Sequence, residues 1–252
     1  MLLDGKHAII YGAGAIGRAV AKAFAREGAT VHLASRTKAG LDEVAGDIRS
    51  AGGAVETAQV DALDEAAVDE HADAVAAEAG RIDITCNAIS YGDVQGTPLA
   101  EMSLADFERP IVTATRTMFL TTRAAARHMI RQRSGVILMF GGDGGRQPIR
   151  DYHIGGFQIA LNTVEALRRQ LAAELGAHGI RAVTLHTGGL PETIPEGFAG
   201  RDAIVRSIVD ATMLKRAATF EDVGNVAAFA ASDKARSLTA TGINITCGAV
   251  AD

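Results

Sequence analysis

Short runs of apolar residues alternate along this chain with longer segments in which apolar residues recur every three or four positions. Runs of the first kind are typical of buried strands, and the longer segments are typical of helices that cover a sheet. The pattern predicts strands at 7–11, 30–35, 54–60, 83–88, 136–140, 181–186 and 243–247. It predicts helices at 16–27, 41–50, 65–79, 104–133, 157–175 and 220–230.

This alternation decides the predicted fold class. Parallel strands joined by right-handed helical crossovers form a doubly wound sheet with helices on both faces. We therefore expect an α/β fold, a Rossmann-type three-layer sandwich with a seven-stranded parallel sheet. No linker rich in Pro, Gly or Ser and no internal repeat divides the sequence, so residues 1–252 are predicted to form a single domain.

A glycine-rich loop, GAGAIG at 12–17, joins the first predicted strand to the first predicted helix. Gly12 permits a tight turn, Gly14 lets the backbone approach a pyrophosphate, and Gly17 lets the helix pack closely on the strand. The helix N-terminus offers free backbone amides to the phosphates. At the start of a βαβ unit this spacing predicts a dinucleotide site rather than a merely structural turn. The predicted contacts in the loop are Gly12, Gly14, Ala15, Ile16 and Gly17.

The residues after the second predicted strand select the cofactor. An NAD site places a carboxylate there, which binds the ribose 2′-hydroxyl. This chain has Ser35 and Arg36 instead. A guanidinium pairs with a 2′-phosphate through two parallel hydrogen bonds, and the serine can donate another. These residues predict NADP(H) as the cofactor; the alternative is that Arg36 is an ordinary surface charge.

Composition argues against several other function classes. Lys and Arg number 25 against 30 Asp and Glu, and the two signs are interspersed, so we expect neither a nucleic-acid surface nor a polybasic membrane patch. No apolar run approaches the ~20 residues of a membrane span, and no signal peptide is evident. Cys86 and Cys247 lie in apolar segments and are expected to be buried hydrophobes. We expect a soluble, cytoplasmic protein without a metal site.

Further motifs follow the glycine loop in a fixed order. They are Asp61-Ala62, Arg81 to Ala88 leading into Asn87-Ala88-Ile89-Ser90, Ser134 to Leu138, Leu171 to Leu175 with His178 to Arg181, and Thr241-Gly242. In this order and spacing they resemble the short-chain dehydrogenase/reductase family over nearly the whole chain. The resemblance implies an NAD(P)-binding Rossmann fold and an oxidoreductase activity.

The resemblance also implies cofactor contacts beyond the loop. Asp61 matches the family's acidic residue that meets the adenine amine. Asn87 and Ala88 stand in a degenerate form of the Asn-Asn-Ala-Gly motif. After the sixth strand Thr187-Gly188 replaces the family's Pro-Gly, and a threonine follows where the family contacts the cofactor amide or phosphates. The implied contacts are Asp61, Ala62, Asn87, Ala88, Gly188 and Thr193.

The family's catalytic Asn, Ser, Tyr and Lys have no counterparts at the matching positions. They fall on Ala114, on or near Gly142, on Phe157 and on Leu161 respectively. No Tyr-x-x-x-Lys pair exists in the chain, so no adjacent ammonium can lower the pKa of a phenol for proton transfer at neutral pH. The sequence predicts a divergent member that lacks the family's proton relay.

The catalytic residues are therefore left unassigned, and other proton donors come into question. Tyr152 and His153 lie just before the helix at 157–175, where the carboxyl ends of the strands gather, although either can be an ordinary loop residue. Tyr91 is a weaker candidate, and Asp143 fits a glycine turn better than a base.

Three functions stay open at this stage. The first is an NADP(H)-binding oxidoreductase that acts on a small carbonyl or alcohol substrate with a non-standard proton donor. The others are a catalytically silent NADP(H)-binding sensor or scaffold, and a non-redox lyase or isomerase on the same fold. We expect the first. By resemblance to the family's interfaces, the helices at 104–133 and 157–175 imply a homodimer or homotetramer.

The segment after the sixth strand is expected to cover the substrate as a stiff, irregular lid. Its apolar residues would either line a pocket or belong to the core of a helix. They are Ile194, Phe198, Ile204, Ile208 and Met213.

Overall fold

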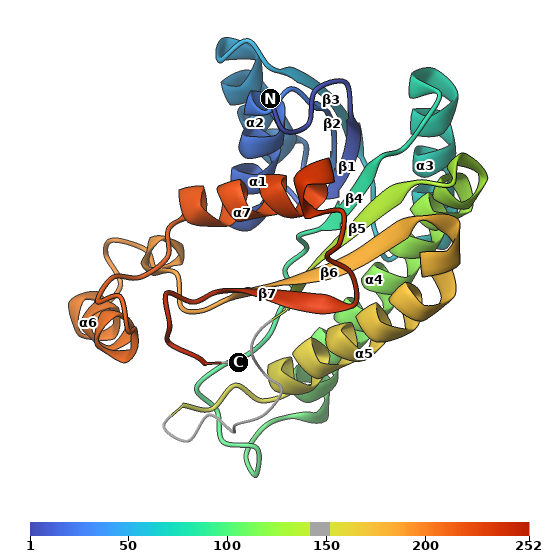
Figure 1. Ribbon diagram of the computed structural model, residues 1–252. Coiled ribbons are helices and arrows are strands. Elements are labelled where there is room, and N and C mark those ends of the chain that lie inside the picture. The colour runs from blue at the N-terminus through green and yellow to red at the C-terminus, as the bar shows by residue number, and fades with distance from the viewer. Residues whose placement is uncertain (142–151, 252) are drawn as a thin grey trace.

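The computed structural model describes residues 1–141 and 152–251 (Figure 1). Its strands are β1 (His7–Tyr11), β2 (Thr30–Ser35), β3 (Ala54–Gln59), β4 (Ile84–Asn87), β5 (Gly135–Gly141), β6 (Ile180–Thr187) and β7 (Thr241–Ile245). They form one seven-stranded sheet in the order β3-β2-β1-β4-β5-β6-β7, and every neighbouring pair is parallel. The predicted α/β class and seven-stranded parallel sheet are confirmed.

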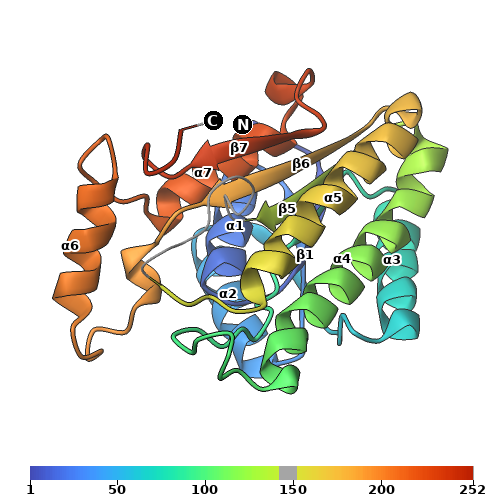
Figure 2. The ribbon, with the colours of Figure 1, turned by 90° about the horizontal axis from the view of Figure 1, so that it is seen from below.

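The helices are α1 (Ala15–Arg26), α2 (Lys38–Ser50), α3 (Glu65–Ala79), α4 (Leu104–Gln132), α5 (Phe157–Leu175), α6 (Arg201–Ala211) and α7 (Phe220–Ala231). Figures 1 and 2 show α1, α2 and α7 on one face of the sheet and α3, α4 and α5 on the other. The sequence pattern did not predict α6, which projects from the body and buries none of its residues. No helix in the described part of the chain is both long and apolar enough to cross a membrane.

Side chains of each strand alternate between two cores. In β1, Ile10 joins the core under α1, α2 and α7, whereas Ile9 and Tyr11 join the core under α3, α4 and α5. Each fully buried aliphatic side chain contributes about 1.5–3 kcal/mol relative to an exposed one. Burial on both faces explains why these strands read as nearly continuous apolar runs in the sequence.

Side-chain caps fix the start of three of the described α-helices. Asp64 caps α3, Ser103 caps α4, and Thr219 forms a capping box with Asp222 at the start of α7. The start of α1 has no such cap, because its N-cap residue, Gly14, has no side chain to offer. The amides at this helix start are therefore available to a ligand.

The direction of winding reverses beside β1, which lies between β2 and β4. In open parallel sheets, ligands bind in the crevice outside the carboxyl ends of the strands at this switch point. The segments after β1 and β4 meet closely there: a Cβ atom on Gly12 would lie 2.6 Å from the carbonyl oxygen of Ala88. The fold therefore places the glycine loop at the position where a ligand is expected.

The start of α5 rests directly on the backbone of α4. A Cβ atom on Gly156 would lie 2.0 Å from the carbonyl oxygen of Phe107 and 3.3 Å from Cγ of Pro110. Any side chain at residue 156 would separate the two helices. This contact between backbones fixes where the first turns of α5 stand.

Candidate cofactor and active site

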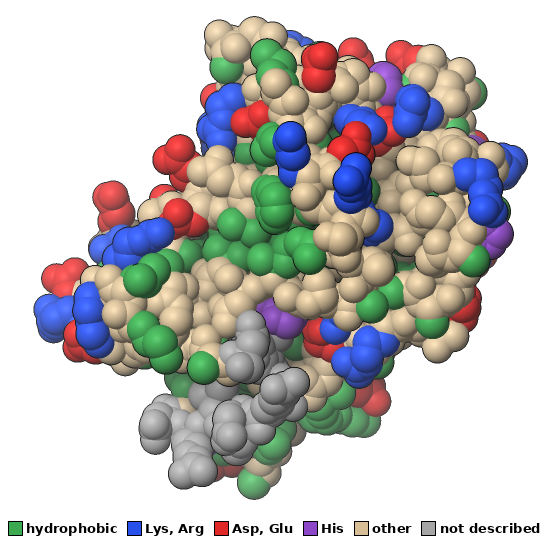
Figure 3. All heavy atoms as spheres, in the orientation of Figure 1, with side chains coloured by type: hydrophobic (Ala, Val, Ile, Leu, Met, Phe, Trp, Pro, Cys, Tyr) green, Lys and Arg blue, Asp and Glu red, His purple; other side chains and the backbone are tan. Residues whose placement is uncertain are grey.

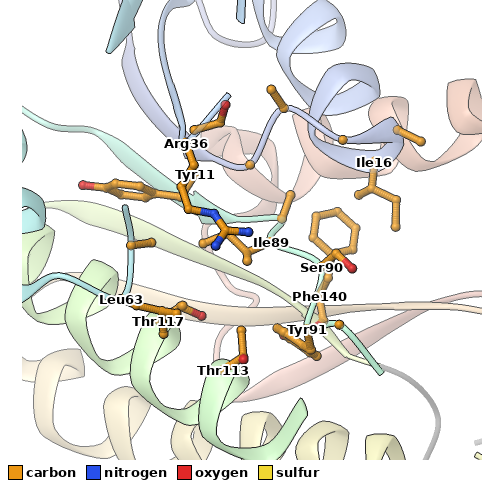
Figure 4. A pocket seen from close by; sticks show the side chains of 18 of the residues that line it. Tyr11, Ile16, Arg36, Leu63, Ile89, Ser90, Tyr91, Thr113, Thr117 and Phe140 are labelled. Carbon is orange, nitrogen blue, oxygen red and sulfur yellow. Dashed lines mark hydrogen bonds between the residues drawn. The ribbon is translucent and has the colours of Figure 1, made fainter. Parts of the chain in front are cut away.

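A cavity of about 970 Å³ opens at the carboxyl ends of the strands, around the end of β1 (Figure 4). Cavities of this size hold ligands of the dinucleotide class. Most of the cofactor contacts expected from the sequence line it: Gly12, Gly14, Ala15, Ile16, Ser35, Arg36, Asp61, Ala62, Ala88 and Thr193. These residues are brought together from five separate stretches of the chain.

Three other expected contacts stand behind the cavity wall. A Cβ atom on Gly17 would lie 1.9 Å from the carbonyl oxygen of Gly12, so Gly17 serves close packing. Asn87 is buried; its Oδ1 accepts a hydrogen bond from the amide of Ile89 at 3.1 Å, and its Nδ2 donates to Thr121 at 3.2 Å. Gly188 packs against Thr246. In the described structure these three residues support the wall rather than line it.

The glycine loop has the geometry of an anion site. Gly12 has a φ of +111°, a backbone conformation that residues other than glycine rarely adopt. A Cβ atom on Gly14 would meet nothing within 4 Å, so the backbone faces open space. The uncapped amides of α1 and the positive end of its dipole point to the same place. This donor set fits a pyrophosphate.

Arg36 occupies the end of the cavity beside β2. Its carbonyl oxygen accepts a hydrogen bond from Nε2 of Gln59 at 2.9 Å, and the hydroxyl of Ser35 accepts one from the amide of Thr37 at 3.2 Å. These bonds hold the turn, and the guanidinium lies in the cavity between Tyr11 and Ile89 (Figure 4). Arg36 makes no ion pair with a carboxylate of the described residues, so its charge faces the cavity.

Tyr11 also lines the cavity, and its hydroxyl lies 3.2 Å from Nδ1 of His71. Burial, and secondarily Asp69, raises the pKa of Tyr11 well above its usual value. Burial, with His32 beside it, lowers the pKa of His71 to about 4. Both side chains are therefore neutral at physiological pH and form an uncharged hydrogen-bonded pair.

Apolar side chains stand at the end of the cavity where α5 begins. Phe157 and Leu161, onto which the family's Tyr and Lys fall by resemblance, both line the cavity. Ala114 is fully buried in α4 and is not among the described lining residues, whereas its neighbours Thr113 and Thr117 are. The Oγ1 atom of Thr117 is buried and has no hydrogen-bond partner.

The candidate proton donors are placed very differently from one another. Tyr152 is 51% exposed, His153 is exposed as well, and neither is among the described lining residues. Gly142 and Asp143 lie outside the described residues. Tyr91, the weaker candidate from the sequence, lines the cavity with its ring centroid 6.1 Å from that of Phe157. Burial, followed by Cys86, raises the pKa of Tyr91.

The sequence pattern missed one pair of titratable residues at this end. Nε2 of His186 lies 2.9 Å from Oε1 of Glu165, and Arg168 donates to the other carboxylate oxygen. The signal available in the sequence was helical spacing, because Glu165 follows Phe157 and Leu161 on one face of α5 at intervals of four residues.

The expected lid contributes little to the described cavity. From the segment after β6, Thr187 and Thr193 line it, and Thr193 is held in a 3₁₀ turn, where its hydroxyl donates to the carbonyl of Leu190 at 2.7 Å. The apolar residues expected there do not line it: Ile194, Phe198, Ile204, Ile208 and Met213. Most are exposed because α6 stands away from the sheet.

The face of the molecule seen in Figure 3 carries no patch of one charge. Hydrophobic side chains gather in the middle of this face, and Lys, Arg, Asp and Glu are mixed around them. In the described chain no group of three or more His, Cys, Asp or Glu side chains could hold a metal ion.

A family model described as enoyl-(acyl carrier protein) reductase matches residues 12–249. The match begins at the glycine loop and runs through β7. The chain belongs to the short-chain dehydrogenase/reductase family. It is an oxidoreductase of a fold that takes a nicotinamide cofactor, and this confirms the family membership expected from the motifs.

Several curated relatives act on alcohols with more than one hydroxyl. Meso-2,3-butanediol dehydrogenase of Serratia marcescens is 30% identical, with 100% of this chain and 97% of that protein covered. D-threitol dehydrogenase of Mycolicibacterium smegmatis is 33% identical over 73% of this chain and 69% of that protein.

Solved structures agree with the fold. Levodione reductase is 25% identical with a TM-score of 0.88, and the alignment covers 97% of each chain. A short-chain type dehydrogenase/reductase from Mycobacterium marinum is 28% identical with a TM-score of 0.85, with 96% of this chain and 94% of that chain covered.

Proposed function

We propose that this chain is a divergent short-chain dehydrogenase/reductase that uses NADP(H) to interconvert a small carbonyl compound and the corresponding alcohol, with a proton donor other than the family's tyrosine. The observation that carries the proposal is the glycine loop opening onto the same cavity as Arg36 and Phe157. One end of the cavity thus suits a phosphorylated dinucleotide, and the other end lacks a phenol at residue 157.

The residues present fit NADP(H). The uncapped amides of α1 beside Gly14 would hold the pyrophosphate, and the carboxylate of Asp61 would accept a hydrogen bond from the adenine amine. The guanidinium of Arg36 would pair with the 2′-phosphate, since no carboxylate of the described residues forms an ion pair with it. The 2′-phosphate is what distinguishes the proposal from NAD(H).

When bound, the cofactor supplies or accepts the hydride. The chain orients the reactants and excludes water, and Phe157 with Leu161 forms an apolar wall at the reacting end. A wall of this kind cannot exchange protons. A separate group must therefore deliver a proton to the oxygen of a carbonyl substrate during reduction.

The substrate class follows from the relatives. Because relatives act on butanediol and threitol, we propose a small secondary alcohol that carries a neighbouring hydroxyl, or the corresponding hydroxyketone. Thr187, together with the hydroxyls of Thr113 and Ser90, gives the cavity polar atoms that could bind such a neighbouring hydroxyl.

Binding and turnover test the proposal separately. Titration of the protein with NADPH and with NADH, followed by the emission of the nicotinamide, should show the tighter dissociation constant for NADPH. Oxidation of meso-2,3-butanediol and D-threitol with NADP⁺, and reduction of 3-hydroxybutan-2-one with NADPH, should show turnover. A preference for NADH would contradict the role given to Arg36.

A second candidate function is a catalytically silent NADP(H)-binding sensor or scaffold. The apolar side chains of Phe157 and Leu161 at the reacting end favour it. Tight NADPH binding without turnover of any of these compounds would select this function over the first.

We also propose that the chain forms a homodimer or homotetramer. Val112 and Phe119 on α4 and Ile159 on α5 are exposed apolar side chains on helices that cover the same face of the sheet. Light scattering coupled to gel filtration measures the assembly mass directly, and a monomer at micromolar concentration would contradict this proposal.

A further inference from the structure

One buried threonine of α4 differs from the other threonines of that helix. Thr115, Thr121 and Thr122 each donate their hydroxyl to the backbone carbonyl four residues earlier, at 2.6, 2.8 and 2.6 Å. This is the common arrangement for a threonine inside a helix. Thr117 is 1% exposed, and its Oγ1 has no hydrogen-bond partner among the described residues. Its hydroxyl is therefore buried and unsatisfied.

An unsatisfied buried hydroxyl lowers the stability of the folded chain. It has lost its hydrogen bonds to water on folding and has gained none in exchange. Such groups are rare in folded proteins, and a bound molecule is one explanation for them. Among the buried side-chain atoms without a partner in the described part of the chain, the Thr117 hydroxyl is the one whose residue lines the cavity.

Thr117 stands at the end of the cavity that is proposed to hold the adenosine half of the cofactor. The preceding residue, Arg116, lines a smaller neighbouring pocket together with Asp61 and Leu63. Asp61 and Leu63 also line the cavity itself, in the segment that follows β3. In Figure 4 the side chain of Thr117 points from α4 into the cavity, toward the side on which Arg36 stands. A molecule bound between these elements would meet Thr117.

The neighbouring polar groups are committed to other hydrogen bonds. The hydroxyl of Tyr11 pairs with Nδ1 of His71 at 3.2 Å, and Oδ1 of Asp61 accepts from the amide of Leu63 at 3.0 Å. Neither is bonded to Thr117, whose hydroxyl can both donate and accept. Adenosine offers a partner for either role, since its ring nitrogens accept hydrogen bonds and its amine and ribose hydroxyls donate them.

We propose that the hydroxyl of Thr117 hydrogen-bonds the adenosine half of the bound cofactor, an inference that rests on the cofactor site proposed above. The bond satisfies a group that the chain alone leaves unsatisfied, so it adds to the affinity for the cofactor. NAD(H) and NADP(H) share this contact, because they differ only in the 2′-phosphate. Thr117 thus sets how tightly a dinucleotide binds, whereas Arg36 sets which one is preferred.

The test compares Thr117→Val with Thr122→Val. Both threonines are buried on α4, but Thr122 already has its hydrogen bond and is not among the described lining residues. We expect Thr117→Val to weaken binding of NADPH and of NADH alike, by about 3- to 10-fold in isothermal titration calorimetry, the value of one hydrogen bond. Thr122→Val should leave both dissociation constants unchanged. Equally tight NADPH binding by Thr117→Val and the wild type would overturn the proposal.

Urea unfolding without cofactor should change in the opposite direction from affinity. Valine has nearly the shape of threonine and lacks the hydroxyl, so Thr117→Val removes the unsatisfied group and should raise the unfolding midpoint. Thr122→Val removes a hydrogen bond that is made and should not raise it. A lower midpoint in Thr117→Val with unchanged NADPH affinity would mean that the hydroxyl serves the folded chain itself, and the proposal would be wrong.

A fragment of the cofactor locates the contact. Adenosine 2′,5′-bisphosphate carries the adenosine half without the nicotinamide, and Thr117→Val should weaken its binding by the same factor as that of NADPH. A loss for NADPH with none for adenosine 2′,5′-bisphosphate would contradict the assignment to the adenosine half.

Two further variants keep the test decisive if Thr117→Val fails to fold. Thr117→Ser keeps the hydroxyl and should bind NADPH as the wild type does. Thr117→Ala lacks the hydroxyl and should show the loss expected of Thr117→Val. Equal losses in the serine and alanine variants would assign the effect to the methyl group and overturn the role of the hydroxyl.

The two proposals fail in different ways. If the wild type binds neither NADPH nor adenosine 2′,5′-bisphosphate, the cofactor site proposed above fails and the role of Thr117 fails with it. If the wild type binds both and Thr117→Val binds them equally well, the role of Thr117 is wrong and the cofactor site stands.

Discussion

The phenol oxygen of Tyr91 lies 3.3 Å from the backbone carbonyl oxygen of Phe140, to which it donates a hydrogen bond. Burial raises the pKa of this phenol, so it holds its proton firmly. We expect Tyr91→Phe to leave kcat within about threefold of wild type, because the phenol already donates its proton to the carbonyl oxygen of Phe140. The variant should lose about 1 kcal/mol of unfolding free energy with that hydrogen bond, measured by urea unfolding.

Steady-state kinetics on the same sample separates the two effects. A large fall in kcat with unchanged unfolding free energy would make Tyr91 the group that serves the substrate oxygen. Tyr152→Phe is a useful companion variant, because Tyr152 is exposed and is not among the described lining residues.

Arg36 controls the choice between the two nicotinamide cofactors. Replacing it by Asp puts a carboxylate where a 2′-phosphate would bind and where an NAD ribose would offer a hydroxyl. We expect Arg36→Asp to weaken NADPH binding by about 10- to 100-fold, the value of one or two charge-assisted hydrogen bonds, and to strengthen NADH binding. Fluorescence titration with each cofactor measures both dissociation constants.

The control for this charge reversal is Arg206→Asp on α6, which is exposed and not among the described lining residues. It should leave the ratio of the two dissociation constants unchanged. Equal shifts in Arg36→Asp and Arg206→Asp would mean that net charge, rather than a specific contact, sets the affinity.

Gly14 and Gly17 make a matched pair, since each can be replaced by Ala in the same helix start. At Gly17 the new methyl group would lie 1.9 Å from the carbonyl oxygen of Gly12, so we expect a loss of about 1–3 kcal/mol or more in unfolding free energy. At Gly14 the methyl group meets nothing within 4 Å, and the protein without cofactor should keep its stability.

The variant that keeps its stability, Gly14→Ala, should be the one that loses affinity for the cofactor. Gly14→Ala places the methyl group where the pyrophosphate is proposed to lie, so NADPH affinity should fall in a protein of normal stability. If Gly14→Ala binds NADPH as tightly as the wild type, the phosphates do not approach this stretch of backbone.

His71 should make the protein less stable in mild acid. Its pKa falls from the ordinary value of 6.5 to about 4 in the folded protein, because burial disfavours the charged ring. Neutral His71 makes its full contribution to the unfolding free energy above pH 6.5. This contribution is lost as the pH falls from 6.5 towards 4, because the unfolded chain then binds a proton that the folded chain does not. The slope is at most about 1.4 kcal/mol per pH unit.

Urea unfolding of His71→Gln across this pH window measures the effect. The glutamine keeps a partner for Tyr11 and removes the titration, so the unfolding free energy should depend less on pH than in the wild type. His178→Gln should retain the wild-type slope. An unaltered slope in His71→Gln would assign the acid sensitivity to another group, such as His32, whose pKa burial also lowers.

The fold could be predicted from the sequence because its signals are local and repeated. Strands such as β5 contain no polar side chain, and the helices between the strands show their period over several turns. Errors occur where burial is incomplete. The helix α6 has no buried face, and β7 ends two residues before the predicted boundary, where the backbone soon turns and Cys247 takes a positive φ.

The cofactor end of the site could be predicted for a different reason. The glycine loop and Arg36 lie within one βαβ unit, so their spacing in the sequence already fixes their spacing in space. Glu165 and His186 belong to separate elements, and their contact depends on space left by glycines in β5 and β7. No pattern along the chain reports that space.

The seating of α5 on α4 has a consequence for how this chain could change its chemistry. Because Gly156 meets the carbonyl of Phe107 backbone to backbone, the frame that presents residues 157 and 161 does not depend on which side chains they carry. Evolution could therefore exchange one set of proton-transfer side chains for another at residues 157 and 161 without changing the backbone of α5. An engineer could attempt the same by installing Tyr at 157 and Lys at 161 together.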